Sequence, residues 1–205
     1  MLLSSINPFI RFARQITVSS INHATVSYDS RLFYVLSGSC VLSLPNGEYQ
    51  LKPGTLLIWK CGTPYKFLIQ ADTSLISVNF DFTQKNSQKK DSISPVLQEV
   101  FKENILCETI CFSDFEILNT PIILNNMQYL KSKIDLIVNE FAKKKLGYDA
   151  VCSAVLKEII TETARIALVS IPENSWKIEK AVQYIEQHFD NDISNSDLAS
   201  VAGYH

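Results

Sequence analysis

The stretch YDSRLFYVLSGSCVLSLPNGEYQLKPGTLLIWKCGTPYKF, residues 28–67, decides the fold of this chain. Glycines recur in it every seven to nine residues, which is the spacing of short strands joined by tight turns. PNG at 45–47 is a hairpin signal, because Asn and Gly both tolerate a positive φ. KPGT at 52–55 joins a proline, which fixes φ, to the glycine that a type II turn requires. The stretch therefore predicts a run of short strands connected by turns.

The segments between these turns predict a closed β structure. They are rich in β-branched and aromatic residues, and several are apolar at both phases of the alternation, so both faces of each strand should be buried. A small barrel or double sheet with helices packed on one side buries both faces in this way. We therefore expect an α+β protein whose first domain, residues 1–122, is a barrel. The predicted strand segments are LFYVLS, CVLSL, TLLIW, YKFLI and SLISVNFDF.

Residues 123–171 predict a pair of antiparallel helices. Apolar residues spaced 3, 4, 3, 4 form a heptad seam on the first helix, and Ala150 to Val169 make the second. The seam leaves two alternatives open: it packs inside one chain, or it meets its copy in a homodimer. In the second alternative the seam residues are the dimerisation residues. They are Met127, Leu130, Ile134, Ile137 and Phe141.

Residues 172–205 begin with a linker and continue with two short helices, the second of which starts in SNSDLASVAGYH at 194–205. A serine followed three residues later by an aspartate predicts a capping box that opens this helix. Small apolar residues give it a packing face, and a glycine suits its left-handed end. A short helix of this kind is typical of the first half of a helix-turn-helix. The residues that carry this prediction are Ser194, Asp197, Leu198, Ala199 and Gly203.

The order of barrel, helical pair, linker and WKIEKAVQYIEQHFDNDISNSDLASVAGYH, at 176–205, resembles the AraC/XylS family of transcriptional regulators. Residues 28–67 are similar to the family's cupin-like (jelly-roll) sensor domain. The resemblance implies a one-component regulator that responds to a small molecule, with a sugar as the leading class. In the family two helix-turn-helix units follow the sensor, and here the first breaks off before its recognition helix. We therefore expect this chain to sense and dimerise, with DNA binding only in the full-length protein.

Composition narrows the alternatives. The 205 residues carry a net charge of −2 and are 46% apolar, and no apolar run approaches the length that spans a bilayer, so we expect a cytoplasmic protein without a membrane partner. Five cysteines without a CxxC pair argue against a disulfide framework, and three scattered histidines argue against a metal site. We therefore expect no cofactor, no metal and no enzyme activity. The alternative is a metal-free cupin-like protein that binds or modifies a sugar.

Five residues are candidates for effector binding. Arg31, at the start of a strand, could anchor a polar group, or be a solvated edge charge. Trp59 and Tyr65 flank the CGTP turn, where they could stack on a sugar ring or belong to the core. Asn79 lies on a polar face of its strand that faces either a pocket or solvent. Phe9 belongs to NPFIR, which resembles the arm that some family members fold over their ligand; the alternative is a first strand.

Overall fold

The structure, a computed structural model, describes all residues except 19–22, 90, 92, 171–174, 190–192 and 204–205. The chain divides into two compact units, Met1–Ala164 and Arg165–His205. The first unit contains the β structure, and the second contains two short helices. Each unit is described by itself below.

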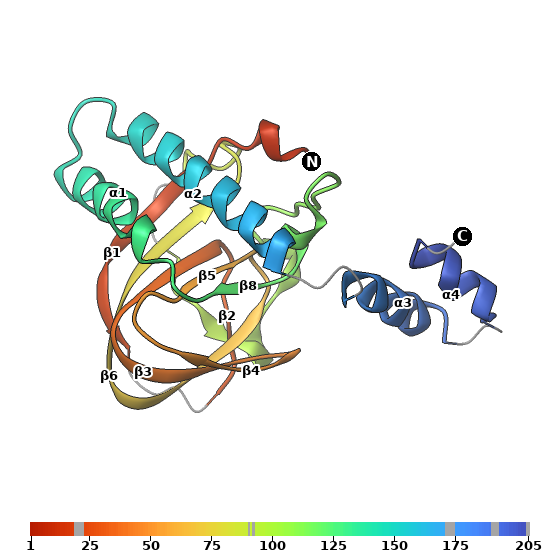
Figure 1. The fold of residues 1–205 in the computed structure, drawn as a ribbon. Coiled ribbons are helices and arrows are strands. Elements are labelled where there is room, and N and C mark those ends of the chain that lie inside the picture. Colours follow the sequence, from red (N-terminus) through yellow and green to blue (C-terminus); the bar gives the residue numbers. More distant parts are fainter. Residues whose placement is uncertain (19–22, 90, 92, 171–174, 190–192, 204–205) are drawn as a thin grey trace. The chain divides into compact units, whose positions relative to one another are not determined.

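The first unit is an antiparallel sheet of eight strands that curls into a barrel (Figure 1). Strands follow the order β7-β2-β6-β3-β5-β8, while β1 pairs with β6 and β4 pairs with β3. The α+β class and the cupin-like barrel predicted from the sequence are confirmed. The strands are β1 (Phe9–Val18), β2 (Thr25–Val26), β3 (Ser30–Leu44), β4 (Gly47–Leu51), β5 (Leu56–Trp59), β6 (Pro64–Asp81), β7 (Val96–Leu97) and β8 (Ile122–Leu124). Short 3-10 helices span Leu3–Ser5, Gln98–Val100, Glu103–Ile105, Glu116–Asn119 and Gln128–Leu130.

The two longest strands correct the sequence prediction. The sequence predicted separate strands for LFYVLS and CVLSL, divided at Gly38, and for YKFLI and SLISVNFDF. In the structure the first two segments belong to one continuous strand, β3, and the last two belong to β6. Register shifts between Val35 and Cys40 bend β3 where it pairs with β6. Gly38 sits in this bend with φ +88°, and a Cβ there would lie 2.1 Å from the carbonyl oxygen of Asp72. The glycine therefore serves a bulge, which bends a strand without ending it.

The interior of the barrel is filled by side chains. Four aromatic rings pack against one another there, with centroids 5.0–6.2 Å apart. Strand alternation places every second residue of β3 in this interior, while the residues between them face outward. The buried residues of this core are Phe33, Val35, Cys40, Leu42, Leu44, Leu51, Leu57, Trp59, Tyr65, Phe67 and Leu75.

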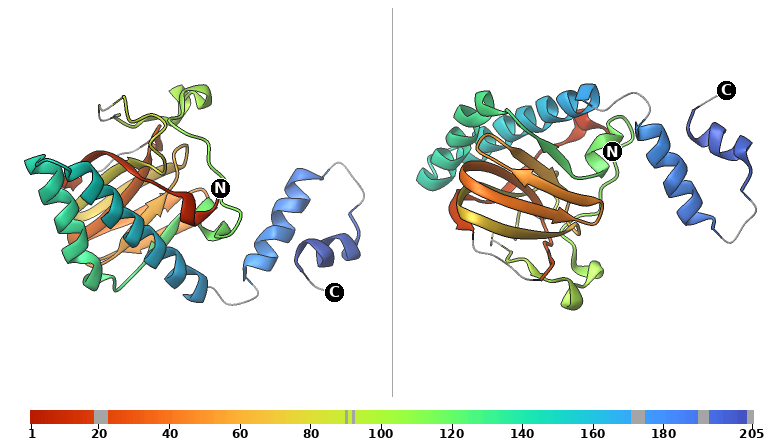
Figure 2. Two further views of the ribbon diagram at one scale, coloured as in Figure 1. Left: turned by 90° about the horizontal axis from the view of Figure 1, so that it is seen from above. Right: turned by 60° about the horizontal axis from the view of Figure 1, so that its bottom comes forward.

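Helices α1 (Lys131–Lys143) and α2 (Tyr148–Ser170) form the predicted antiparallel pair. Figure 2 shows both helices along one side of the barrel. Of the five seam residues, Met127, Leu130, Ile134 and Ile137 are at most 3% exposed in the single chain, and only Phe141 is partly accessible. Four of the five seam residues therefore pack inside the chain, which is the first of the two alternatives that the sequence left open.

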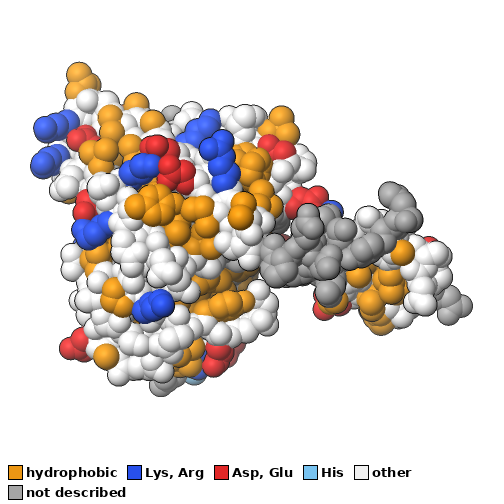
Figure 3. All heavy atoms as spheres, in the orientation of Figure 1, with side chains coloured by type: hydrophobic (Ala, Val, Ile, Leu, Met, Phe, Trp, Pro, Cys, Tyr) orange, Lys and Arg blue, Asp and Glu red, His pale blue; other side chains and the backbone are white. Residues whose placement is uncertain are grey.

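Figure 3 shows apolar and charged side chains mixed on the face that carries the helices. The exposed apolar residues of the two helices include Leu136, Val151, Leu168 and Val169; Tyr129 just before α1 and Leu146 in the connection between the helices are also exposed. Lys133 joins the two helices by ion pairs to Glu158, at 3.1 Å, and Glu162, at 2.8 Å.

In the second unit, α3 (Ser175–Gln187) contacts α4 (Asn195–Val201). Ser194 and Asp197 form the expected capping box, and Gly203 has a φ of +73° just beyond the helix. Leu198 and Ala199 are partly buried, as a packing face requires. Within the residues that the structure describes, no helix is both long and apolar enough to cross a bilayer.

Candidate functional site: a buried polar cluster at one end of the barrel

Three of the five candidate ligand residues lie side by side in the barrel. Arg31 on β3 is opposite Asn79 on β6 and opposite Trp59 on β5. All three side chains are buried, with exposed fractions of 4%, 3% and 1%. Arg31 is therefore not a solvated edge charge, and the polar face of β6 is turned inward, away from solvent. Strand pairing thus brings Arg31 next to Trp59 and Asn79, which lie 28 and 48 positions further along the sequence.

Two buried ion pairs lie at this position in the barrel, and Arg31 belongs to one of them. A guanidinium nitrogen of Arg31 lies 2.6 Å from a carboxylate oxygen of Asp29, and Arg11 on β1 pairs with Asp81 at the end of β6. Arg31 also donates a hydrogen bond of 2.9 Å to the carbonyl oxygen of Ile93. Both guanidiniums are thus buried at the same end of the barrel, each beside a buried carboxyl group.

Among the residues that the structure describes, several polar atoms of this cluster have no hydrogen-bond partner. They are both carboxylate oxygens of Asp29, the Nε of Arg31 and the Nε1 of Trp59. Asp29 and Arg31 are close enough for an ion pair, but their orientation does not give a hydrogen bond. A buried donor or acceptor left without a partner costs about 1–3 kcal/mol. The cluster therefore presents unused donors beside unused acceptors, which a bound polar group could satisfy.

The carboxyl groups of the cluster are difficult to ionise. Burial raises the pKa of Asp29 to about 6 despite the nearby Arg31. Burial also raises the pKa of Asp81, although its hydrogen bond with Arg11 acts in the opposite direction. Glu108 accepts hydrogen bonds from the backbone N–H of Phe82 and the hydroxyl of Thr83, yet burial raises its pKa to about 7. Three carboxyl groups thus share the cluster with two guanidiniums.

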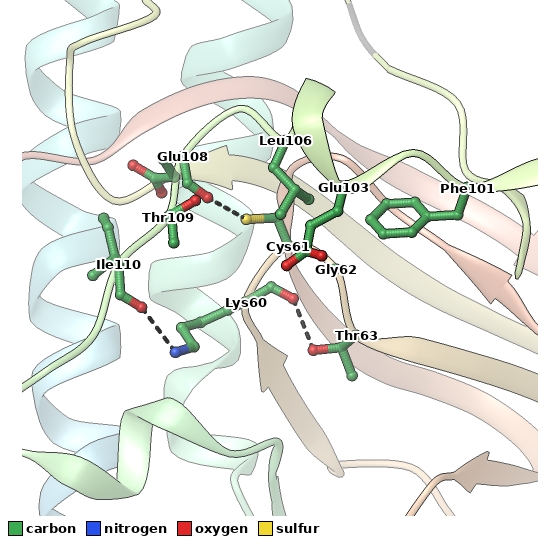
Figure 4. A pocket seen from close by; sticks show the side chains of 10 residues that line it. All are labelled: Lys60, Cys61, Gly62, Thr63, Phe101, Glu103, Leu106, Glu108, Thr109 and Ile110. Atoms are coloured by element: carbon green, nitrogen blue, oxygen red, sulfur yellow. Dashed lines mark hydrogen bonds between the residues drawn. The ribbon is translucent and has the colours of Figure 1, made fainter.

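A pocket of about 430 Å³ adjoins the cluster at Glu108 (Figure 4). It lies between the turn at residues 60–63 and the wall formed by residues 101–110. The Cys61 thiol donates to the carbonyl oxygen of Glu108 at 2.9 Å, which ties the turn to the wall. The pocket is lined by Lys60, Cys61, Gly62, Thr63, Phe101, Glu103, Leu106, Glu108, Thr109 and Ile110.

The other two candidates occupy different positions. Tyr65 is buried, with its ring centroid 5.0 Å from that of Trp59, so both aromatics belong to the core and neither lies at an open rim. Phe9 is the first residue of β1 and pairs with Asp81 on β6. The segment that resembled a ligand-covering arm is thus the start of a first strand, which was the alternative. The centroid of the Phe9 ring lies 5.2 Å from the guanidinium carbon, Cζ, of Arg11.

Asp29, Arg11, Asp81 and Glu108 were not among the site residues predicted from the sequence. The first three are charged residues near strand ends, a pattern that solvent-exposed residues share, and Glu108 is a single acid in a segment without periodicity. The described part of the chain contains no group of three or more His, Cys, Asp or Glu residues able to hold a metal ion.

These features define an α+β protein with a cupin-like barrel, a helical pair and a small helical unit. No family model and no curated protein matches the chain. Among solved structures, it is similar to apo ToxT K231A from Vibrio cholerae strain SCE256, with 9% identity and a TM-score of 0.50 over 95% of this chain and 70% of that one. Unsaturated fatty acid-bound wild-type ToxT from the same strain matches at 10% identity and a TM-score of 0.46, covering 95% and 69%. A cupin-2 domain protein from Shewanella frigidimarina matches at 13% identity and a TM-score of 0.30, covering 32% and 66%. The first of these likenesses shows a shared fold, and none shows a shared ligand.

Proposed function

We propose that this chain is the sensor region of a ligand-responsive transcriptional regulator of the AraC type. The order of cupin-like barrel, helical pair and capped short helix supports the proposal. So does the fold that the chain shares with apo ToxT, because ToxT is an AraC-family regulator. In this role the protein is a cytoplasmic homodimer and not an enzyme.

The observation that carries the sensor role is the set of unpaired polar atoms on Asp29, Arg31 and Trp59. A hydroxyl group both donates and accepts, so one hydroxyl can satisfy an Asp29 oxygen and accept from Arg31 or Trp59. The rings of Trp59 and Tyr65 pack against each other in the core, so the proposed recognition rests on the unpaired polar atoms and not on stacking against these rings. We therefore propose that the effector is a small molecule rich in hydroxyl groups, with sugars as the leading class.

A thermal-shift screen of sugars, polyols and sugar acids tests this proposal. A ligand that binds only the folded state raises stability by about 2.7 kcal/mol at a hundredfold excess over Kd. We expect one chemically related set of compounds to raise the Tm. Trp59→Phe keeps an aromatic ring but removes the Nε1–H, so it should weaken those compounds roughly threefold to tenfold by deleting one hydrogen bond.

Trp176→Phe is the matched control for this substitution, and affinity should be unchanged in that variant. Arg31→Gln tests the second donor and should also weaken the same compounds. Binding that survives both Trp59→Phe and Arg31→Gln without loss would place the effector elsewhere. A screen without any stabilising compound would contradict the assignment of hydroxyl-rich effectors.

A further inference from the structure

We propose that Glu108 is a proton-controlled latch that holds the pocket wall, residues 101–110, against the end of the barrel. The contacts of the latch follow from the geometry around Glu108, and its control by a proton follows from the burial of this carboxyl group without a cation partner among the described residues. Only its consequence, that proton binding regulates access to the effector site, rests on the proposed function. The latch is closed when Glu108 is protonated and is released when it ionises.

The contacts of Glu108 connect three parts of the first unit. Its carboxyl group accepts from the N–H of Phe82 and from the hydroxyl of Thr83 at 3.1 Å, just beyond the end of β6. Its carbonyl oxygen accepts from the Cys61 thiol in the turn across the pocket. The side chain is only 8% exposed. Figure 4 shows the wall and the turn facing each other across the pocket at this point.

Charge balance explains why a proton controls these contacts. Asp81 is paired with Arg11, and Asp29 is paired with Arg31, but Glu108 forms no ion pair with any described residue. It is the third carboxyl group beside two guanidiniums. Lys60 and the exposed Glu103 line the same pocket, and the Lys60 ammonium donates to the carbonyl oxygen of Ile110 and the side-chain oxygen of Asn119. The thiols of Cys61 and Cys107 are also nearby; burial raises their pKa values to about 12 and 11, so neither supplies a charge at neutral pH.

The direction of the effect follows from the two environments of Glu108. In the closed state burial, with Asp81 nearby, raises its pKa from 4.5 to about 7. In an opened state, with the side chain in water, the pKa returns to its ordinary value. The closed state thus binds the proton more tightly. The free energy of opening therefore becomes more favourable as the pH rises from the ordinary pKa of glutamate to about 7. Above that pH the free energy of opening no longer changes. Because Glu108 lies in the pocket wall, opening widens the pocket.

Hydrogen exchange of the Phe82 amide measures the latch directly, since this N–H donates to the Glu108 carboxyl group. In the ligand-free protein we expect the protection of this amide, corrected for intrinsic exchange, to fall about tenfold or more between about pH 5 and pH 7.5. Glu108→Gln cannot ionise, so its Phe82 protection should be independent of pH. Glu103→Gln is the matched control, because Glu103 is an exposed glutamate in the same wall, and it should behave like the wild type.

A carbon-13 NMR titration of the Glu108 carboxyl group in the wild-type protein provides a second test that requires no folded variant. A midpoint near neutrality supports the latch. A midpoint at the ordinary value of glutamate, or Phe82 protection that does not change with pH in the wild type, overturns it. Both measurements use the protein without effector, so a failed ligand screen leaves their result intact.

Discussion

Arg31 illustrates how the surroundings of one residue decide its role. At the sequence level an arginine at a strand start has two meanings, a solvated charge or a buried anchor. Pairing with β5 and β6 places it between Trp59 and Asn79, where its charge is balanced by Asp29. Nothing in the order of residues 28–34 specifies those strand partners, because they lie far along the chain. The burial of Arg31 therefore becomes visible only in three dimensions.

The Asp29–Arg31 pair gives a prediction at this scale. Arg31→Gln should destabilise the protein by about 3–5 kcal/mol at pH 7.5, because it leaves the Asp29 carboxylate buried without a cation. The double variant Arg31→Gln with Asp29→Asn should recover a substantial part of that loss, since it removes both charges. Urea unfolding of the wild type, both single variants and the double variant measures this coupling. Strictly additive free energies would mean that the two side chains do not interact.

The strands and helices were the most predictable part of the molecule. Gly47 and Gly54 mark real turns, and the helical pair and the Ser194 capping box occur where local sequence chemistry placed them. The continuity of β3 through Gly38 was not predictable, because a glycine at a bulge and a glycine at a turn look alike in sequence. The site depends instead on the first part of β3, where Arg31 pairs with Trp59 on β5 and with Asn79 on β6. Local sequence signals thus predicted the strands and helices. The site residues are brought together by pairing between strands that are distant in sequence.

The heptad seam yields a prediction at the scale of one helix. Ile134 is fully buried, so Ile134→Ala should lower the free energy of unfolding by about 2–5 kcal/mol. Leu136 is 42% exposed on the same helix, and Leu136→Ala is the matched control, with an expected change within about 0.5 kcal/mol. Light scattering should find the same molecular mass for Ile134→Ala as for the wild type. A monomer produced by Ile134→Ala alone, with native stability, would restore the seam as a subunit interface.

On the scale of the whole molecule, the two units differ in how their residues are buried. The aromatic core, the polar cluster and the pocket all belong to Met1–Ala164. In Arg165–His205 the described buried residues are two alanines, Ala167 and Ala202, so this unit contributes little apolar area to any core. The proposed effector site therefore lies entirely within the first unit.

A shortened chain of residues 1–170, which keeps all of α2, tests this division. We expect it to fold with a Tm within a few degrees of the full chain, because burial of apolar side chains supplies most of the stability and the core is intact. It should also retain the effector-induced thermal shift and the pH dependence of Phe82 exchange, since every residue involved lies before position 110. Circular dichroism, thermal shift and hydrogen exchange on both chains make the comparison. An unfolded 1–170 chain, or one that folds but loses the pH dependence at Phe82, would mean that residues 171–205 are needed to maintain the sensor.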